Sequence, residues 1–262
     1  MSEAGGAPGR VWLVGGGPGR EDLLTVAAVD ALAQADVVLY DRLAPSRNLR
    51  SLAPTATLID VGKNPGFHPI GQDEIESLII AHARAGARVV RLKGGDPYVL
   101  GRGSEEVLAC HAAGIPVTVI PGVSSISAVP ASVGIPLTHR NLSHLFTVVS
   151  GHAPLSDTEL RHLAGLGATI VVLMGIGTLA PLTTGLIAHG LSVDTPVAII
   201  ENGFRPAQRS TIASLGTIVA RSAIVGVRSP AVIVIGDVVR LAYDGDADAE
   251  TLIARAATLA GG

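Results

Sequence analysis

The chain has 262 residues, 48% of them hydrophobic, and a formal net charge of −3 at pH 7. The acidic balance argues against a nucleic-acid partner, and no apolar run reaches the roughly 18 residues of a membrane-spanning helix. Residues 1–10 lack the apolar segment of a secretion signal, and the single cysteine, Cys110, cannot form an internal disulfide. We therefore expect a cytoplasmic protein without a membrane partner, with Cys110 as a small buried side chain.

Short apolar runs alternate with helical patterns through the first half of the chain. Expected strands cover residues 11–14, 37–40, 57–61, 89–92 and 117–120, and expected helices cover 22–35 and 72–85. This alternation predicts an α/β fold with a mainly parallel sheet and helices on both of its faces.

The rhythm restarts in the second half, with expected strands at residues 145–149, 169–174, 197–200 and 231–235. Residues 205–214 look like a hairpin-type addition, which predicts a mixed sheet. We expect two α/β domains with an active-site cleft between them. The predicted organisation is a tail at 1–10, an N-terminal domain at 11–136, a connection at 137–143, a C-terminal domain at 144–242 and a loose helical tail at 243–262.

A glycine-rich loop, residues 15–19, follows the first expected strand, and Asp41 ends the second. A dinucleotide-binding fold would place similar features there. The match fails in detail, because Arg20 stands where the dinucleotide spacing requires glycine and Pro18 removes an N–H group from the loop. A nicotinamide-dependent oxidoreductase is therefore a minor alternative.

Two more loops of this kind follow the fourth and fifth expected strands, at residues 93–97 and 121–125. Each alone is as compatible with an ordinary turn as with a site. Ligands of open α/β sheets bind beyond the carboxyl ends of the strands, so loops at that edge together favour a small-molecule site.

Motifs along residues 11–241 occur in the order seen in one enzyme family. They include Tyr40-Asp41-Arg42-Leu43, Val61-Gly62-Lys63, Arg91-Leu92-Lys93-Gly94-Gly95-Asp96-Pro97, Pro121-Gly122-Val123-Ser124-Ser125 and Glu201-Asn202-Gly203. The chain resembles the uroporphyrinogen-III C-methyltransferases of the tetrapyrrole methylase superfamily. The resemblance implies two α/β domains, S-adenosyl-L-methionine in the cleft between them, a homodimer and no metal. Departures from the family pattern are Arg20 in place of Asp, and Ser124-Ser125 in place of Thr-Ala.

The resemblance also assigns roles to residues that match the family's motifs. It implies a proton acceptor at Asp41, a proton donor at Lys63, and substrate-binding arginines at Arg42, Arg102 and Arg140. The implied cofactor-binding residues are Pro18, Gly94, Gly95, Asp96, Val99, Ser124, Ser125, Met174 and Gly203. Other interpretations remain open: Asp41 as a partner of Arg42 or a helix cap, Met174 as a core thioether, and the arginines as surface charges.

The implied reaction adds methyl groups at C2 and C7 of uroporphyrinogen III, giving precorrin-2 and S-adenosyl-L-homocysteine, for sirohaem or cobalamin biosynthesis. The alternatives are another precorrin C-methyltransferase and a ribosomal-RNA methylase of the same superfamily, which the acidic balance disfavours. Only about ten residues precede the first expected strand, so we expect a chain with this single activity.

Overall fold

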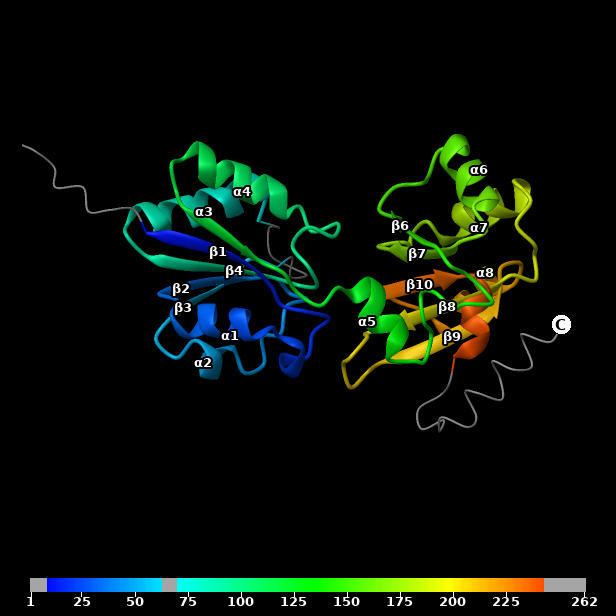
Figure 1. The fold of residues 1–262 in the computed structure, drawn as a ribbon, viewed down its shortest axis with the longest axis horizontal. Helices are drawn as coiled ribbons and strands as arrows, with labels where there is room; N and C mark the ends of the chain where they lie inside the picture. Colours follow the sequence, from blue (N-terminus) through cyan, green and yellow to red (C-terminus); the bar gives the residue numbers. More distant parts are fainter. Residues whose placement is uncertain (1–8, 63–69, 243–262) are drawn as a thin grey trace, which may run out of the picture. The chain divides into compact units, whose positions relative to one another are not determined.

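The computed structural model describes residues 9–62 and 70–242, and the chain divides into two compact units, Met1–Ser124 and Ser125–Gly262. Each unit contains one five-stranded sheet (Figure 1). Lys63, residues 1–8 of the tail expected at 1–10, and the tail expected at 243–262 lie outside the described residues, and the first strand begins at Arg10, inside the expected N-terminal tail. The two α/β domains expected from the alternating pattern are confirmed.

The sheet of the N-terminal unit is parallel at every pairing, with the strand order β3-β2-β4-β1-β5. Its strands are β1 (Arg10–Gly15), β2 (Val37–Tyr40), β3 (Thr57–Asp60), β4 (Arg88–Lys93) and β5 (Val117–Ile120). Strands β1 and β4 are buried over all but their first residue because helices cover both faces, which explains the apolar residues 11–14 of β1 and Val89, Val90 and Leu92 of β4.

Among the described residues of this unit, α-helices cover both faces of the sheet (Figure 1). Helices α1 (Val26–Ala33) and α2 (Leu49–Leu52) pack with Val90 and Leu92 of β4 in one apolar cluster. Helices α3 (Gln72–Arg84) and α4 (Gly103–Ala112) pack on the opposite face with Val89. Alternate residues of β4 therefore face different helix pairs, as the twofold period of a strand requires.

The first long helix begins later than the pattern predicted. The expected start was residue 22, whereas α1 begins at Val26 and residues Glu21–Leu23 form a separate 3₁₀ turn, η1. The hydroxyl of Thr25 accepts a hydrogen bond from the Ala28 N–H at 3.2 Å. This side-chain cap satisfies a free amide of the first helical turn, so it fixes the start of the helix there.

The sheet of the C-terminal unit is mixed, with the strand order β6-β7-β10-β8-β9. Its strands are β6 (Phe146–Ser150), β7 (Thr169–Leu173), β8 (Pro196–Glu201), β9 (Arg209–Ser214) and β10 (Ala231–Ile235). Only β6 and β7 pair in parallel, and the β8–β9 hairpin agrees with the hairpin-type segment expected near residues 205–214. Strand β10 lies between β7 and β8, although it comes last in the sequence.

One face of the mixed sheet packs against α6 (Asp157–Gly165), α7 (Leu179–Ala188) and α8 (Ile218–Val225). The other face packs against α5 (Ser125–Ala131) and the 3₁₀ helix η2 (Asp237–Leu241).

The division between the units falls at Ser124, earlier than the expected domain end at residue 136. Helix α5 belongs to the C-terminal unit because Val129 and the following Val133 are buried against apolar side chains of that unit's sheet. The free energy gained by burying these side chains decides to which unit α5 belongs, although the helix follows β5 closely in the sequence.

The loops after β1, β4 and β5 meet at one edge of the parallel sheet. Gly95 and Gly17 exchange two backbone hydrogen bonds, of 2.7 and 3.2 Å. A Cβ atom on Gly122 would lie 2.4 Å from the carbonyl oxygen of Gly95 and 2.7 Å from the carbonyl carbon of Gly15. The three loops can approach this closely only because glycine stands at these positions.

We expect the substitution Gly122→Ala to destabilise the protein by about 1–3 kcal/mol, because the added methyl group would overlap two backbones. Urea unfolding followed by circular dichroism measures this free energy. Gly165→Ala is the control, because nothing lies within 4 Å of its added Cβ atom. Equal stability of the Gly122→Ala variant and the unmodified protein would contradict the packing described here.

Candidate active site

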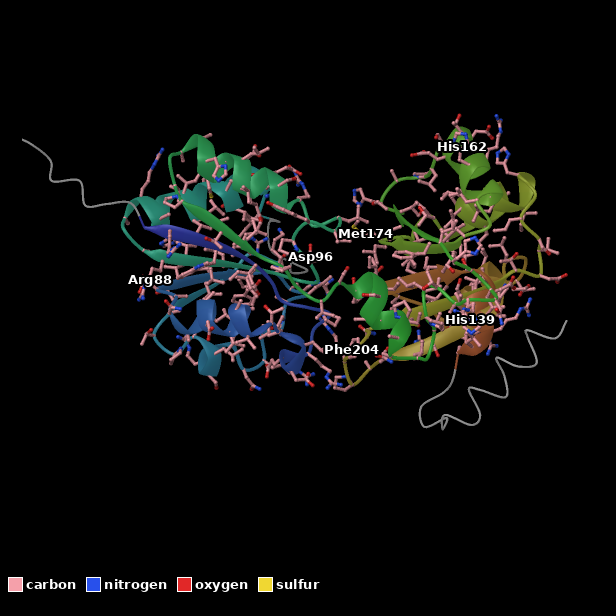
Figure 2. The ribbon with its side chains drawn as sticks, in the orientation of Figure 1. Arg88, Asp96, His139, His162, Met174 and Phe204 are labelled. Carbon is pink, nitrogen blue, oxygen red and sulfur yellow. The ribbon has the colours of Figure 1, made fainter. Side chains whose placement is uncertain are left out.

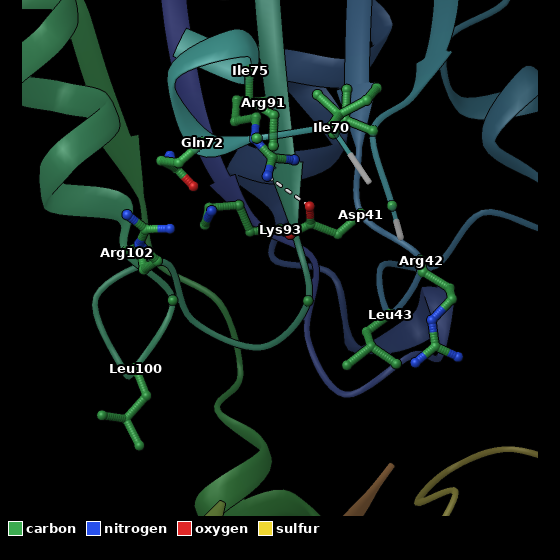
Figure 3. Close-up of a pocket in the computed structure, with 15 residues that line it drawn as sticks. Asp41, Arg42, Leu43, Ile70, Gln72, Ile75, Arg91, Lys93, Leu100 and Arg102 are labelled. Atoms are coloured by element: carbon green, nitrogen blue, oxygen red, sulfur yellow. Dashed lines mark hydrogen bonds and ion pairs between the residues drawn. The ribbon is translucent and has the colours of Figure 1, made fainter. Parts of the chain in front are cut away.

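A pocket of about 550 Å³ lies within the N-terminal unit, at the carboxyl ends of its strands (Figure 3). Its wall comes from the ends of β2 and β4, residues 61–62 after β3, the start of α3 and the loop before α4. Among the described lining residues four carry a positive charge and one a negative charge: Arg42, Arg91, Lys93, Arg102 and Asp41. The pocket therefore suits an anionic ligand.

Two of these cations are buried at the end of β4. Arg91 is 2% and Lys93 4% exposed, and both point toward the α3 and α4 side because they are two residues apart on one strand. They lie on the same face of β4 as Val89, which packs in the apolar cluster with α3 and α4. A buried cation requires a nearby anion.

Glu106 of α4, 2% exposed, supplies that anion. Its Oε1 atom accepts hydrogen bonds from Arg91 Nε at 3.0 Å, from Lys93 Nζ at 3.1 Å and from Gln72 Nε2 at 3.3 Å. The Oε2 atom lies 3.0 Å from Lys93 Nζ, an ion contact without the alignment of a hydrogen bond. One carboxylate thus joins two cations and the first residue of α3.

Asp41 lies directly after β2 and receives a second arm of Arg91. Arg91 Nη2 donates to Asp41 Oδ1 at 2.6 Å (Figure 3). The parallel register pairs Leu39 with Arg91, so the end of β2 lies beside the charged end of β4. The side chain of Asp41 stays 31% exposed. The partner of Asp41 is thus Arg91, rather than the neighbouring Arg42 considered from the sequence.

The pKa of the Lys93 ammonium lies below its ordinary value of 10.5. Burial is the main cause, and the positive charge of Arg91 adds to it, while the negative charges of Glu106 and Asp41 oppose the shift. Desolvation disfavours the charged form of an amine. Lys93 therefore releases its proton more readily than a lysine in water.

The two predicted substrate-binding arginines of this unit, Arg42 and Arg102, lie in the wall of the same pocket and are exposed. Arg102 has a left-handed backbone with φ of 57° and precedes α4. It forms a two-pronged ion pair with Glu105, with distances of 2.6 and 3.0 Å. Arg140 belongs to the C-terminal unit, where its side chain is exposed.

The predicted cofactor residues of the N-terminal unit lie in the loops beyond its strands. Gly94 lines the pocket and Gly95 pairs with Gly17, next to Pro18. Asp96 accepts hydrogen bonds from the Tyr98 N–H at 2.9 Å and the Gly122 N–H at 3.1 Å, so its carboxylate ties the loop after β4 to the loop after β5. Val99 lies in the first of these loops and Ser124 in the second.

The remaining predicted cofactor residues, Ser125, Met174 and Gly203, belong to the C-terminal unit. Met174 directly follows β7, has φ of 59° and is 48% exposed (Figure 2). The alternative of a core thioether is therefore wrong. Gly203 packs closely on α5, since an added Cβ atom would lie 2.5 Å from Val129 Cγ2.

Sequence reasoning did not assign site roles to Glu106, Arg91, Lys93 or Gln72. A signal was available for the two cations, because they interrupt an apolar strand and share one of its faces. Their anion could not be found in the same way, because α4 carries Glu105 and Glu106 side by side and only packing decides which of them is buried.

Comparison with known proteins gives consistent matches. The family model described as Tetrapyrrole (Corrin/Porphyrin) Methylases matches residues 10–219. The chain is 45% identical to the chloroplastic S-adenosyl-L-methionine-dependent uroporphyrinogen III methyltransferase of Arabidopsis thaliana, over 89% of this chain and 64% of the relative. It is 44% identical to the enzyme of the same activity from Methanosarcina barkeri, over 89% of this chain and 93% of the relative.

A solved structure is similar as well. The uroporphyrin-III C-methyl transferase of Thermus thermophilus complexed with S-adenyl homocysteine superposes with a TM-score of 0.73 at 42% identity, over 89% of this chain and all of the other. Several matched relatives are longer, and the chain spans about half the length of those named siroheme synthase.

Cys110 lies one turn after Glu106 on α4, where burial and the negative charge of Glu106 raise the pKa of its thiol to about 11. We expect no modification of native protein by iodoacetamide at pH 8, because only about 0.1% of such a thiol is ionised there and the side chain is 1% exposed. Mass spectrometry after labelling checks this, with urea-unfolded protein as the control. Rapid labelling of the native protein would contradict the placement of Cys110.

Proposed function

The chain belongs to the tetrapyrrole (corrin/porphyrin) methylases, and from this premise we propose that it methylates uroporphyrinogen III at C2 and C7 with S-adenosyl-L-methionine as donor. The product is precorrin-2, which serves sirohaem biosynthesis. The observation that carries the proposal is the cationic pocket containing Asp41, in a chain 44% identical to a methyltransferase of this activity over most of both lengths.

The pocket's charge fits the substrate. Uroporphyrinogen III carries a carboxylate on every one of its side chains, so its binding site needs several cations. Arg42 and Arg102 are exposed at the pocket, and a guanidinium can bind a carboxylate through two hydrogen bonds. We assign substrate binding to these two arginines and to Arg140.

The chain's residues also fit the methyl donor. When bound, S-adenosyl-L-methionine supplies an electrophilic methyl group. The glycine-lined loops after β1, β4 and β5 bring backbone N–H and C=O groups to one rim, where side chains would collide. Met174 exposes an apolar thioether directly after β7. We assign cofactor binding to Pro18, Gly94, Gly95, Asp96, Val99, Ser124, Ser125, Met174 and Gly203, which hold and orient the donor.

A methylated pyrrole ring is cationic until it loses a proton, so a carboxylate at the site has a role. We assign proton acceptance to Asp41, which faces the pocket and is held by Arg91. We assign proton donation to Lys63, on the basis of its family motif alone, because it lies outside the described residues.

The proposal extends to assembly and location. We propose a homodimer, as the resemblance implies, with sedimentation velocity as the measurement of assembly, and a cytoplasmic location, as expected from the sequence composition. Within the described residues, no helix is both long enough and apolar enough to span a bilayer.

The proposed function is tested with purified protein, uroporphyrinogen III and isotopically labelled S-adenosyl-L-methionine under anaerobic reducing conditions. Mass spectrometry should find two labelled methyl groups on each product ring. A product without added methyl groups, while precorrins are methylated, would reassign the chain to a different methylase of the family.

We expect Asp41→Asn to lower turnover by roughly 100-fold or more, because the amide cannot accept the proton. Its affinity for S-adenosyl-L-homocysteine, measured by titration calorimetry, should stay within about twofold of the unmodified protein. Asp30→Asn, an exposed carboxylate on α1, is the matched control and should be fully active. Normal turnover in the Asp41→Asn variant would exclude this residue as the acceptor.

We expect Arg102→Ala to raise the KM for uroporphyrinogen III by roughly 10-fold, the effect of losing a charged hydrogen-bond pair, with the KM for the methyl donor nearly unchanged. Arg88→Ala is the control: Arg88 is exposed, has a similar two-pronged pairing with Asp36 and stands at the opposite end of β4. An equal change in both KM values, or an equal effect of Arg88→Ala, would argue against substrate binding by Arg102.

A further inference from the structure

Glu106 is a buried charge that the reaction described above does not use. It is 2% exposed and is absent from the pocket wall, whereas its three partners, Arg91, Lys93 and Gln72, line the pocket. It therefore lies one layer behind the pocket surface, and any effect on a bound ligand must pass through these partners.

The connection from Glu106 to Asp41 runs through the planar side chain of Arg91. The guanidinium of Arg91 donates to Glu106 through Nε and to Asp41 through Nη2, and Figure 3 shows the bond to Asp41. A guanidinium is planar, so fixing the direction of one N–H bond fixes the others. The position of Glu106 on α4 thus determines where Arg91 holds Asp41 Oδ1.

Glu106 also balances charge. The buried cluster contains Arg91 and Lys93 on one side, and Glu106 and the partly exposed Asp41 on the other. Removal of the Glu106 charge would leave two adjacent buried cations, with Asp41 as the carboxylate that Arg91 still contacts. Asp41 would then be drawn toward the buried end of the cluster and away from the pocket.

We propose that Glu106 is a positioning residue, which fixes the guanidinium of Arg91 so that Arg91 holds Asp41 in the orientation needed to accept a proton. This inference rests on the proposed function, since it concerns the role assigned to Asp41. It differs from a purely structural role, because it requires the effect of Glu106 on turnover to pass through the Asp41 carboxylate.

The test is a double-mutant cycle with Glu106→Gln, which keeps the shape of the side chain and removes its charge. We expect Glu106→Gln alone to lower kcat by roughly 10- to 100-fold, the effect of misplacing a reacting group by about 1 Å. The dissociation constant of S-adenosyl-L-homocysteine should stay within about twofold. Asp30→Asn again serves as the exposed control.

The decisive measurement combines Glu106→Gln with Asp41→Asn. We expect the double variant to have the kcat of Asp41→Asn alone, because no proton acceptor remains to be positioned. Multiplication of the two losses would show that Glu106 acts independently of Asp41 and would overturn the inference. A normal kcat in the Glu106→Gln single variant would overturn it equally.

A second variant covers the case in which Glu106→Gln does not fold. Arg91→Lys keeps a cation at the end of β4. A compact ammonium group lacks the planar set of N–H donors with which the guanidinium bonds Glu106 and Asp41 together. We expect the double variant Arg91→Lys with Asp41→Asn to have the kcat of Asp41→Asn alone. A kcat lowered by the product of the two single losses would contradict the link from Glu106 through Arg91 to Asp41. Absence of methylation by the unmodified protein would refute the proposed function itself. The variants test only the link from Glu106 through Arg91 to Asp41, so the two outcomes are distinguishable.

Discussion

The constraint on which the pocket depends is the burial of Arg91 and Lys93 around one carboxylate, Glu106. Such a cluster is not an efficient way to stabilise a fold, since desolvating several charges offsets much of their mutual attraction. An apolar set of side chains of similar volume would serve a sheet and a helix at least as well. The cluster places two cations at the pocket with their directions fixed, which mobile surface side chains cannot do.

The parallel topology explains why these residues meet. Strands β2 and β4 are neighbours, so Asp41 and Lys93, each at a carboxyl end, lie at the same edge of the sheet. The same edge collects the glycine-rich loops after β1, β4 and β5. One edge thus provides both a charged pocket and a rim of accessible backbone, the two features that a polyanionic substrate and a polar cofactor require.

Much of this arrangement could be predicted from the sequence, because it follows from local pattern. The strand positions and the parallel and mixed sheets follow from apolar runs, and the grouping of Asp41, Arg42 and Arg102 follows from the family resemblance. Two features could not be predicted in this way. A side-chain cap decides that α1 starts at Val26, and packing against strands distant in the sequence places α5 in the C-terminal unit. The link from Glu106 to Asp41 requires the tertiary register.

The strand orders have a consequence for synthesis on the ribosome. All five strands of the N-terminal sheet have been made once Ile120 is translated, so that sheet can assemble while the rest of the chain is still emerging. The C-terminal sheet must wait for Ala231–Ile235, because β10 fills the gap between β7 and β8. Until then two apolar strand edges lack their shared neighbour, which leaves this half of the nascent polypeptide open to pairing with other chains.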